Sequence, residues 1–460
     1  MFAKIQRIHF VGIGGIGMSG IAEVLLNLGY KISGSDLKPS SVTQRLEAMG
    51  TQISAGHRAE NVAGADVVVT SSAIVGDNPE VAEAARLHIP VIQRAEMLAE
   101  LMRLKYGIAI AGMHGKTTTT SMVAAVLAAG GLDPTVVVGG RVDAMGSNAR
   151  LGKSQYLVAE ADESDRSFLK LSPILSVVTN IDREHMDCYR DMQDVEDTFV
   201  DFMNRVPFYG MVVACADDAP LRSLLARVKR RVVTYGTSQD ADFRVQAFAS
   251  RPIPALNQFR VRYRDQDLGE FQLHVPGQHN VLNAAAAIAV GVGLDISRDH
   301  IREALQSFRG VDRRFQRKGA VRGITVIDDY GHHPTEIRAT LSAAKQAGFA
   351  RVHVIFQPHR YSRTQLLMDD FASAFADATT ISVLDIYPAS EAPIAGITGE
   401  SLARRIRERG ERSAQFAPSF ADAVNTVAAQ AREGDLILTL GAGNVSQLAP
   451  QVLDRLSAPE

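Results

Sequence analysis

The sequence has few cysteines, no excess of charge of one sign and no long apolar run. Its two cysteines, Cys188 and Cys215, are too few for a disulfide framework and lack the spacing of a paired metal site. We expect both thiols to be reduced, with Cys188 a bystander near a candidate site. Lys and Arg number 49 and Asp and Glu number 51, a formal net charge of −2, which argues against nucleic acid or an anionic membrane surface as a partner.

Membrane and export signals are also missing. No apolar run reaches the roughly 20 residues that span a bilayer. Met1–Val11 does not combine a basic start, a long apolar stretch and a small-residue cleavage site. We therefore expect a cytoplasmic protein. Because its net charge is near zero, local groups such as helix N-termini and single basic side chains must hold any anionic ligand.

Short β-branched runs alternate along the chain with Ala- and Leu-rich helical stretches, a pattern typical of parallel sheets with helical crossovers. The 460 residues are too many for one ordinary core, and 46% hydrophobic with 22% charged residues is the composition of a globular protein. We predict an α/β protein of three domains: a Rossmann-like domain (1–105), a central P-loop ATPase-like domain (106–309) and a second Rossmann-like domain (310–460). The central sheet is expected to be mostly parallel, with a small antiparallel part between Phe243 and Val275 and a buried helix over Asn280–Val292.

The segment AGMHGKTTTT, Ala111–Thr120, has the position and composition of a phosphate loop between a strand and a helix. Backbone amides of such a turn cradle phosphate oxygens, the lysine reaches the terminal phosphates, and the following hydroxyl binds Mg²⁺. Ile110 stands where the usual pattern has its first glycine, so this loop is a variant, and a purely structural glycine turn is the alternative. The predicted ATP contacts in the loop are Gly112, Met113, His114, Gly115, Lys116, Thr117 and Thr118.

Acidic residues follow a strand that we expect next to this loop. The strand in YLVAEADESD leads into Glu160, Asp162, Glu163 and Asp165. A further strand leads into NIDREHMD and places His185 at the same sheet edge. Since Mg²⁺ prefers oxygen ligands, a histidine indicates a second metal position. We predict that Thr117 and Glu160 hold one metal and His185 another; a solvated acidic loop is the alternative, most of all for Asp165 and Asp187.

A second glycine loop, GIGGIGMSG, spans Gly12–Gly20 after an apolar strand. It contains the G-x-G-x-x-G spacing, and Asp36 follows Gly17 by roughly 20 residues, as in a dinucleotide fingerprint. NAD is one interpretation, but any nucleotide diphosphate can use the same helix N-terminus. Glycines that only allow close helix–sheet packing are the remaining alternative.

Polar residues are dense after two strands of the last domain, in DDYGHHPTE (Asp328–Glu336) and PHRYSRT (Pro358–Thr364). Ligands collect at such carboxyl ends of strands. Arg360 and Arg363 can bind a carboxylate or phosphate with a planar fork. His332 and His333 have a structural alternative inside the loop, but their clustering with two arginines favours a site.

The order of these motifs resembles the Mur ligase family, which builds the peptide stem of bacterial cell-wall precursors. The resemblance covers essentially the whole chain and is carried by GIGGIGMSG, AGMHGKTTTT, EADESD, NIDREHMD, PGQHNVLNA, RRF, DDYGHHPTE and PHRYSRT. Its alanine-adding branch implies an ATP- and Mg²⁺-dependent ligase that joins L-alanine to the carboxylate of UDP-N-acetylmuramate through an acyl phosphate. These small molecules are the implied partners of a monomer or homodimer.

The resemblance also implies roles for particular residues. It implies UDP rather than NAD at the first glycine loop, with contacts from Gly14, Gly15, Gly17, Asp36, His57, Ser71, Ser72 and Arg94. Asn280 and Asn283 would approach the adenine end of ATP, and Arg314 would face the phosphates. The residues implied where alanine meets the muramate carboxylate are Tyr330, His332, Arg360 and Arg363, which join Lys116 and His185 in the catalytic set. We expect His332 to assist the loss of the amine proton.

The chain departs from the family pattern at two points. Met113 stands where these loops commonly have threonine, a change that leaves backbone cradling intact. Several members use a carbamylated lysine near the metal, but no lysine occurs between Lys170 and Lys229. Three alternatives stay open: a recycling ligase that attaches a tripeptide to the same UDP-sugar, a NAD-dependent oxidoreductase, and a nucleotide-binding regulatory protein without catalysis.

Overall fold

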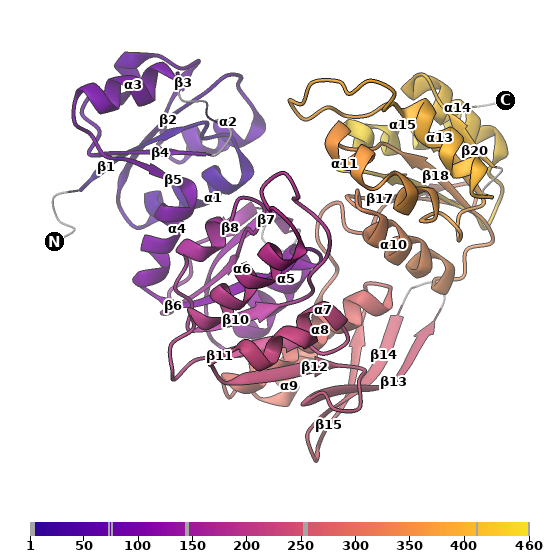
Figure 1. The fold of residues 1–460 in the computed structure, drawn as a ribbon, viewed down its shortest axis with the longest axis horizontal. Coiled ribbons are helices and arrows are strands. Elements are labelled where there is room, and N and C mark those ends of the chain that lie inside the picture. Colours follow the sequence, from indigo (N-terminus) through magenta and orange to yellow (C-terminus); the bar gives the residue numbers. More distant parts are fainter. Residues whose placement is uncertain are drawn as a thin grey trace. The chain divides into compact units, whose positions relative to one another are not determined.

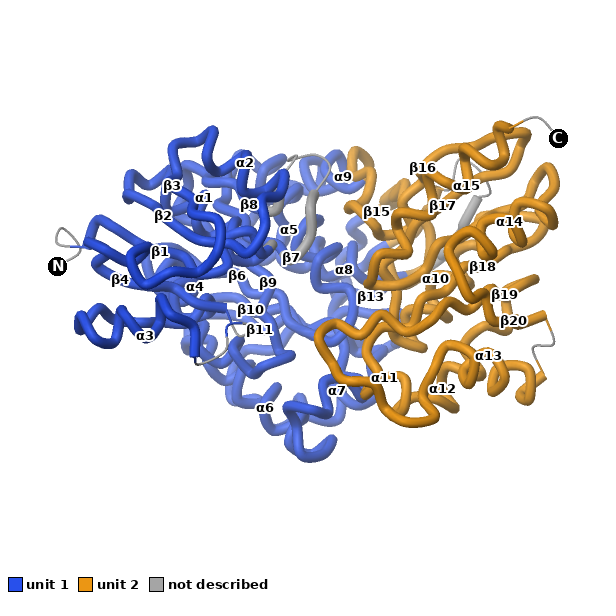
Figure 2. Tube along the Cα trace, turned by 90° about the horizontal axis from the view of Figure 1, so that it is seen from above, with its two compact units in different colours: residues 1–245, 261–268, 282–305 blue, residues 246–260, 269–281, 306–460 orange. Residues whose placement is uncertain are grey.

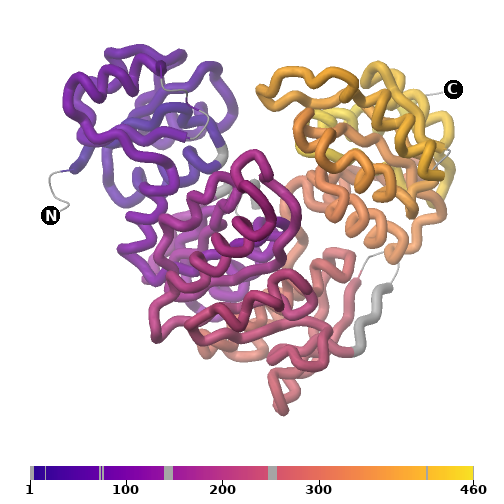
Figure 3. Tube along the Cα trace, in the orientation of Figure 1, coloured from indigo at the N-terminus to yellow at the C-terminus, as the bar shows by residue number. Residues whose placement is uncertain are grey.

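The computed structural model describes residues 5–71, 74, 77–142, 147–251, 256–410 and 413–458, which Figure 3 traces in chain order. Ser72, a predicted UDP contact, lies outside these residues. The chain divides into two compact units, one with residues 1–245, 261–268 and 282–305 and the other with 246–260, 269–281 and 306–460 (Figure 2). Across the described residues, no helix has both the length and the apolar character that crossing a bilayer requires.

The first sheet has five parallel strands in the order β3-β2-β1-β4-β5. The strands are β1 (Arg7–Val11), β2 (Lys31–Asp36), β3 (Gln52–Ala55), β4 (Val67–Thr70) and β5 (Val91–Gln93). The helical elements, which Figure 1 shows around these strands, are α1 (Ile16–Asn27), α2 (Ser41–Ala48), η2 (Ala59–Val62), α3 (Pro79–Arg86) and α4 (Arg94–Arg103). From β1 the chain adds β2 and β3 on one side of the sheet, and then β4 and β5 on the other side. The glycine loop after β1 therefore lies at the switch point where doubly wound sheets bind ligands.

The second sheet has ten strands in the order β15-β14-β13-β12-β11-β10-β6-β9-β7-β8. The strands are β6 (Tyr106–Ala111), β7 (Thr135–Val142), β8 (Ser147–Arg150), β9 (Tyr156–Glu160), β10 (Leu175–Val178), β11 (Met211–Cys215), β12 (Val232–Gly236), β13 (Phe243–Arg251), β14 (Leu256–Tyr263) and β15 (Gln266–Leu273). β6 pairs in parallel with both β9 and β10, whereas β7 and β8 pair antiparallel. The segment after β6 is therefore flanked by the carboxyl ends of β9 and β10.

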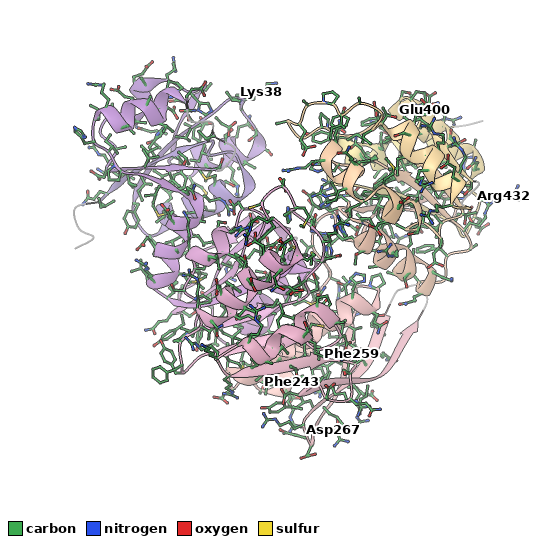
Figure 4. All side chains as sticks on the ribbon, viewed as in Figure 1. Lys38, Phe243, Phe259, Asp267, Glu400 and Arg432 are labelled. Carbon is green, nitrogen blue, oxygen red and sulfur yellow. The ribbon has the colours of Figure 1, made fainter. Side chains whose placement is uncertain are left out.

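Several helical elements belong to the same part of the chain as this sheet. The helical elements are α5 (Lys116–Ala129), η3 (Ser167–Lys170), α6 (Met192–Asn204), α7 (Ala219–Leu224), η4 (Leu225–Arg227), α8 (Gln278–Gly293) and α9 (Arg298–Ser307). Residues 284–290 of α8 are all fully buried, which confirms the predicted buried helix. A Cβ at Gly291 would lie 2.8 Å from Val126 Cγ1, so α8 and α5 pack closely. On the sheet itself, the ring of Phe243, labelled in Figure 4, stacks on that of Tyr263 with centroids 4.3 Å apart.

The third sheet has six strands in the order β16-β17-β21-β18-β19-β20. The strands are β16 (Gln316–Val321), β17 (Ile324–Asp329), β18 (Val352–Phe356), β19 (Thr380–Val383), β20 (Ala414–Phe416) and β21 (Leu436–Leu440). The helical elements are α10 (Pro334–Gln346), α11 (Tyr361–Leu366), α12 (Met368–Ala372), α13 (Gly399–Glu408), α14 (Phe420–Gln430), η5 (Asn444–Gln447) and α15 (Leu448–Ser457). β16 runs antiparallel to β17, and the other pairs are parallel.

Both faces of this third sheet are covered by apolar clusters, and successive strand residues belong to opposite faces. Val354 and Phe356 of β18 belong to one apolar cluster, with Ile337 of α10. Ile355 belongs to the other, with Val452 of α15. β18 reads VHVIF, an apolar run interrupted only by His353, and this run is the signal on which its prediction rested.

The predicted fold class is confirmed: three α/β parts, a mostly parallel central sheet and antiparallel pairs. Sequence patterns did not predict short strands such as β3 and β20, which have only four and three residues. Strands this short carry too few residues to show a period. The domain boundaries near residues 105 and 310 stay predictions.

Candidate active site

The phosphate loop connects β6 to α5, and Lys116 is the first residue of that helix. Gly115, the N-cap, has a left-handed backbone with a φ of 82°, which glycine adopts without strain. A Cβ at this position would lie 2.8 Å from Oδ1 of Asn283, so a side chain would not fit. The predicted ATP contacts Gly115 and Asn283 are therefore neighbours.

Lys116 is held by its own loop and by one buried carboxylate. Its Nζ donates to the carbonyl oxygens of Gly112 at 2.7 Å and Met113 at 3.2 Å. It also donates to Oε1 of Glu163 at 2.8 Å. Burial acts to lower the pKa of Lys116, but nearby carboxylates, above all Glu163, outweigh it and raise this pKa. The lysine is therefore a preformed cation at the start of α5.

Glu163 is the carboxylate that meets this cation, and only 1% of it is exposed. Its backbone carbonyl accepts a 2.6 Å hydrogen bond from the hydroxyl of Tyr189, which fixes the segment that carries it. Nε2 of His185 lies 3.5 Å from Oε1. Within the described residues, Oε2 is buried and has no hydrogen-bond partner. In the sequence Glu163 is one acid among several without an assigned role; the structure brings it together with Lys116 and His185.

Parallel pairing explains why these groups meet at one edge. In the registers of β6 with its neighbours, Ile110 is opposite Glu160 of β9, and Ala111 is opposite Val178 of β10. Glu160 is thus the last residue of the strand beside the loop. Asn180 follows β10, and its Oδ1 accepts a 2.8 Å hydrogen bond from the amide of His114.

The remaining loop residues have distinct surroundings. Nε2 of His114 lies 2.8 Å from Oδ2 of Asp182. The side chain of Met113 is buried, so it packs inward and leaves the backbone of the loop free of it. Thr117 is half-buried and Thr118 is buried. Oδ1 of Asp165 accepts from the amide of Ser167 at 2.9 Å, which favours the alternative that this acid has a loop-structuring role.

The first glycine loop brings together its own backbone and Asp36. Oδ2 of Asp36, the last residue of β2, accepts a 2.8 Å hydrogen bond from the amide of Gly14. A Cβ on Gly14 would lie 2.7 Å from that oxygen, so only glycine allows this approach. Gly15 is the N-cap of α1, whose first turn contains no acidic residue. An uncapped helix N-terminus of this kind suits an anion such as a diphosphate.

His57 belongs to a buried polar network behind this loop. Its Nδ1 lies 2.9 Å from Oγ of Ser35, and that hydroxyl donates to Oε2 of Glu80 at 2.7 Å. Glu80 is fully buried and also accepts from the amide nitrogen of Asn61. Burial acts to raise the pKa of Glu80, but hydrogen bonds from His9, Ser35 and Asn61 lower it from 4.5 to about 2. Ser71, another predicted UDP contact, directly follows β4.

Arg94 links the first glycine loop to the acidic segment after β9. A Cβ on Gly17 would lie 3.0 Å from its Nη1, which places the guanidinium against α1. Its Nη2 donates to Oδ2 of Asp162 at 3.1 Å. Burial acts to raise the pKa of Asp162, but hydrogen bonds from Ser164 and the charges of Lys116 and Arg94 lower it.

The segments RRF and DDYGHHPTE form one network around Tyr330. The guanidinium groups of Arg313 and Arg314 lie 4.9 and 5.0 Å from the centre of the Tyr330 ring. Nε of Arg313 donates to Oδ2 of the buried Asp328 at 3.1 Å.

Asn280, a predicted ATP contact, lies near the start of α8. Its Nδ2 donates to the carbonyl of Pro276 at 2.7 Å and so supports the first turn of that helix.

His332 and Arg363 both lie close to His359, a residue to which sequence analysis assigned no role. The ring centroids of His332 and His359 are 5.8 Å apart. Nη1 of Arg363 lies 3.2 Å from Nδ1 of His359 and donates to its carbonyl at 3.1 Å. His333, in contrast, caps α10 through Nδ1 and is buried, as its structural alternative predicts. Arg360 has a φ of 71° and a ψ of 137°, a strained conformation for a non-glycine residue.

Comparison with known proteins gives the same order of parts. The Mur ligase family catalytic domain matches residues 7–106, the Mur ligase middle domain 110–291 and the Mur ligase glutamate ligase domain 313–443. The chain belongs to the Mur ligase family.

Individual relatives are similar over their full length. A UDP-N-acetylmuramate–L-alanine ligase of Koribacter versatilis is 71% identical over 462 residues, covering 100% of this chain and 99% of that protein. One of Acidobacterium capsulatum is 66% identical over 458 residues, with the same coverage of 100% and 99%. The crystal structure of a UDP-N-acetylmuramate-alanine ligase from Thermotoga maritima superposes with a TM-score of 0.82 at 31% identity, covering 98% of each chain.

Proposed function

We propose that this protein joins L-alanine to the carboxylate of UDP-N-acetylmuramate and converts ATP to ADP and phosphate, a step of peptidoglycan precursor synthesis. Three features support this function: the family, the full-length identity to ligases of that name, and the phosphate loop. The observation that carries it furthest is Lys116, a cation held at the start of α5 by the buried carboxylate of Glu163.

The proposed reaction has two steps. The muramate carboxylate attacks the γ-phosphorus of ATP, which forms an acyl phosphate and releases ADP. The alanine amine then attacks the acyl carbon, and phosphate leaves with the bonding electrons. The first step brings two anions together, so positive charge must be in place before it starts. Lys116 supplies one such charge, and the amides at the N-terminus of α5 supply partial charges.

The donor set beside the loop fits magnesium. Glu160 ends β9 next to the loop, and the buried Oε2 of Glu163 has no hydrogen-bond partner among the described residues, so hard oxygen donors are present. We propose that Thr117 and Glu160 hold one ion and that His185 contributes to a second. When bound, Mg²⁺ supplies further positive charge against the phosphate oxygens.

The amino acid is proposed to bind beside the third sheet. Arg360 and Arg363 would orient its carboxylate, which places the amine for attack. His332 is our candidate to assist the loss of the amine proton, because its ring lies beside His359 and Tyr330 in the same cluster. UDP is proposed to bind at the N-terminus of α1, within reach of Asp36 and Arg94.

Phosphate release tests this function. The purified protein is incubated with ATP, Mg²⁺ and UDP-N-acetylmuramate, and L-alanine, glycine or the tripeptide is added in separate reactions. We expect release that depends on both the UDP-sugar and L-alanine. Release with the tripeptide alone would assign the chain to the recycling activity. An absence of release under every condition would leave a nucleotide-binding fold without the proposed chemistry.

A further inference from the structure

Tyr387 lies directly behind the cluster proposed to bind the amino acid. Its ring is nearly parallel to that of His359, with an interplanar angle of 12° and centroids 5.5 Å apart. Because His359 touches His332 and Arg363, Tyr387 forms a second layer behind those groups. A shift of the Tyr387 ring would therefore change the position of His359 and, through His359, the surroundings of His332 and Arg363.

The backbone of Tyr387 is tied to the segment that carries the two arginines. Its amide donates to the carbonyl of Pro358 at 2.8 Å, and its carbonyl accepts from the amide of Arg360 at 2.9 Å. His359 and Tyr387 form an isolated parallel β-bridge. These bonds also hold Arg360 in its unusual conformation. Removal of the ring would leave them in place, since none of them involves the side chain.

A second tie lies four residues further on. Glu391 accepts from the amide of Ser362 at 3.0 Å and from its hydroxyl at 2.6 Å. Its Oε1 also lies 3.8 Å from Nη1 of Arg360, too far for a hydrogen bond, so the Ser362 contacts are the stronger ones. With both ends of the segment 387–391 fastened, its backbone is not expected to collapse into space left by a smaller side chain.

A cavity of about 350 Å³ at the carboxyl ends of β18, β19 and β20 is lined by Tyr387 but not by His359. Tyr387 lines it together with apolar residues that include Ile386, Pro388 and Phe420. The Tyr387 ring is also pressed against the glycine loop after β21, because a Cβ on Gly443 would lie 2.8 Å from its Cγ. The side chain is 37% exposed, as expected for a ring at the edge of an open cavity.

We propose that Tyr387 is a specificity-determining residue that acts by positioning His359. Its ring holds His359 as the wall that limits the amino-acid side chain, and it separates that wall from the 350 Å³ cavity. This inference rests on the proposed function, since it concerns the same amino-acid site. Without the ring, His359 can move back toward the cavity, and a larger side chain gains room.

The test compares amino-acid preference in three forms of the full-length protein: wild type, Tyr387→Ala and Tyr387→Phe. The kcat/KM values are measured for L-alanine, L-2-aminobutyrate and L-valine with ATP and the UDP-sugar saturating. Tyr387→Ala should reduce the preference for L-alanine over 2-aminobutyrate by about tenfold, the lower end of what one methylene is worth in a pocket. The KM for ATP should stay unchanged. Tyr387→Phe keeps the ring and should behave like wild type.

An unchanged preference in Tyr387→Ala, or an equal fall for all three amino acids, would overturn the proposal. If Tyr387→Ala does not fold, Tyr387→Leu replaces it, with a smaller change expected in the same direction. Wild-type turnover with L-alanine distinguishes a failure of the proposed function from a failure of the role of Tyr387. If wild type does not use L-alanine, the proposed function fails; if it does and the preference ignores residue 387, only the inference fails.

Discussion

The Nζ atom of Lys116 donates a 2.8 Å hydrogen bond to Oε1 of Glu163, across 47 positions of sequence. The lysine comes from the start of α5, and the glutamate comes from the segment after β9. A charged group as buried as Glu163 is almost always paired with an opposite charge. The partner of Glu163 is Lys116. A phosphate that arrives at the loop must therefore share the lysine with a carboxylate already bound to it.

Lys116→Ala should lower turnover by orders of magnitude while the fold stays intact, because the charge lost is one that offsets the approach of two anions. Phosphate release measures turnover, and far-UV circular dichroism with thermal unfolding checks the fold. Lys105→Ala is the matched control, a lysine at the amino end of β6, away from the loop. Near-normal turnover in Lys116→Ala would show that the phosphate-loop assignment is wrong.

Glu163→Ala should lower the free energy of unfolding by about 3 kcal/mol, since it leaves a buried cation without its carboxylate. Urea unfolding of wild type, both single variants and the Lys116→Ala/Glu163→Ala double variant measures the coupling. The double variant should lose less stability than the sum of the single losses. Strict additivity would mean that the hydrogen bond contributes nothing to stability.

Arg363→Lys should raise the KM for L-alanine far more than the KM for ATP, because a lysine cannot reproduce the planar fork that holds a carboxylate. Initial rates with each substrate varied in turn provide both constants. Arg432→Lys, an exposed arginine on the same part of the chain (labelled in Figure 4), should change neither. Equal rises in both constants would exclude a dedicated role of Arg363 in amino-acid binding.

Glu80 predicts an acid-dependent loss of stability. Its folded-state pKa of about 2 lies below the ordinary 4.5, so the group binds fewer protons when folded than when unfolded. Its contribution is therefore fully present above pH 4.5 and is lost as the pH falls toward 2, by roughly 3 kcal/mol in all. Urea unfolding of wild type and Glu80→Gln across this window measures the difference. The two proteins should lose stability with different slopes; identical slopes would mean that Glu80 is not the group responsible.

Local patterns were enough to predict much of the fold and the position of each loop. The strand over Val352–Phe356 is apolar except for His353, and the helix over Asn280–Val292 is Ala-rich, so both were recognisable from composition alone. Gly115 before Lys116 predicted the phosphate loop because its conformation and the helix start are encoded within a few residues. The predicted site residues remain proposals, but the structure does place Gly14 beside Asp36 and Gly115 beside Asn283.

Other relationships have no local signal. Glu163 could not be told from its acidic neighbours, because what distinguishes it is burial beside a lysine from another element. His359 and Tyr387 gave no hint of stacking, since they meet only through a bridge between separate segments. Glu80 is a single acid near the start of a helix, with no local pattern that marks it, whereas in the structure it is the centre of a buried network.

The sequence by itself determined most of the longer helices and strands, the family and the turns that can hold phosphate, because backbone conformation and hydrophobic periodicity depend on residues near one another in the chain. Only the tertiary structure decided which charges meet. Strand order and register place the carboxyl ends of β9 and β10 on either side of β6. The segment after β9 therefore lies beside the phosphate loop, and its Glu163 pairs with Lys116. Burial strengthens this ion pair, since charges removed from water interact strongly with the few groups that they touch.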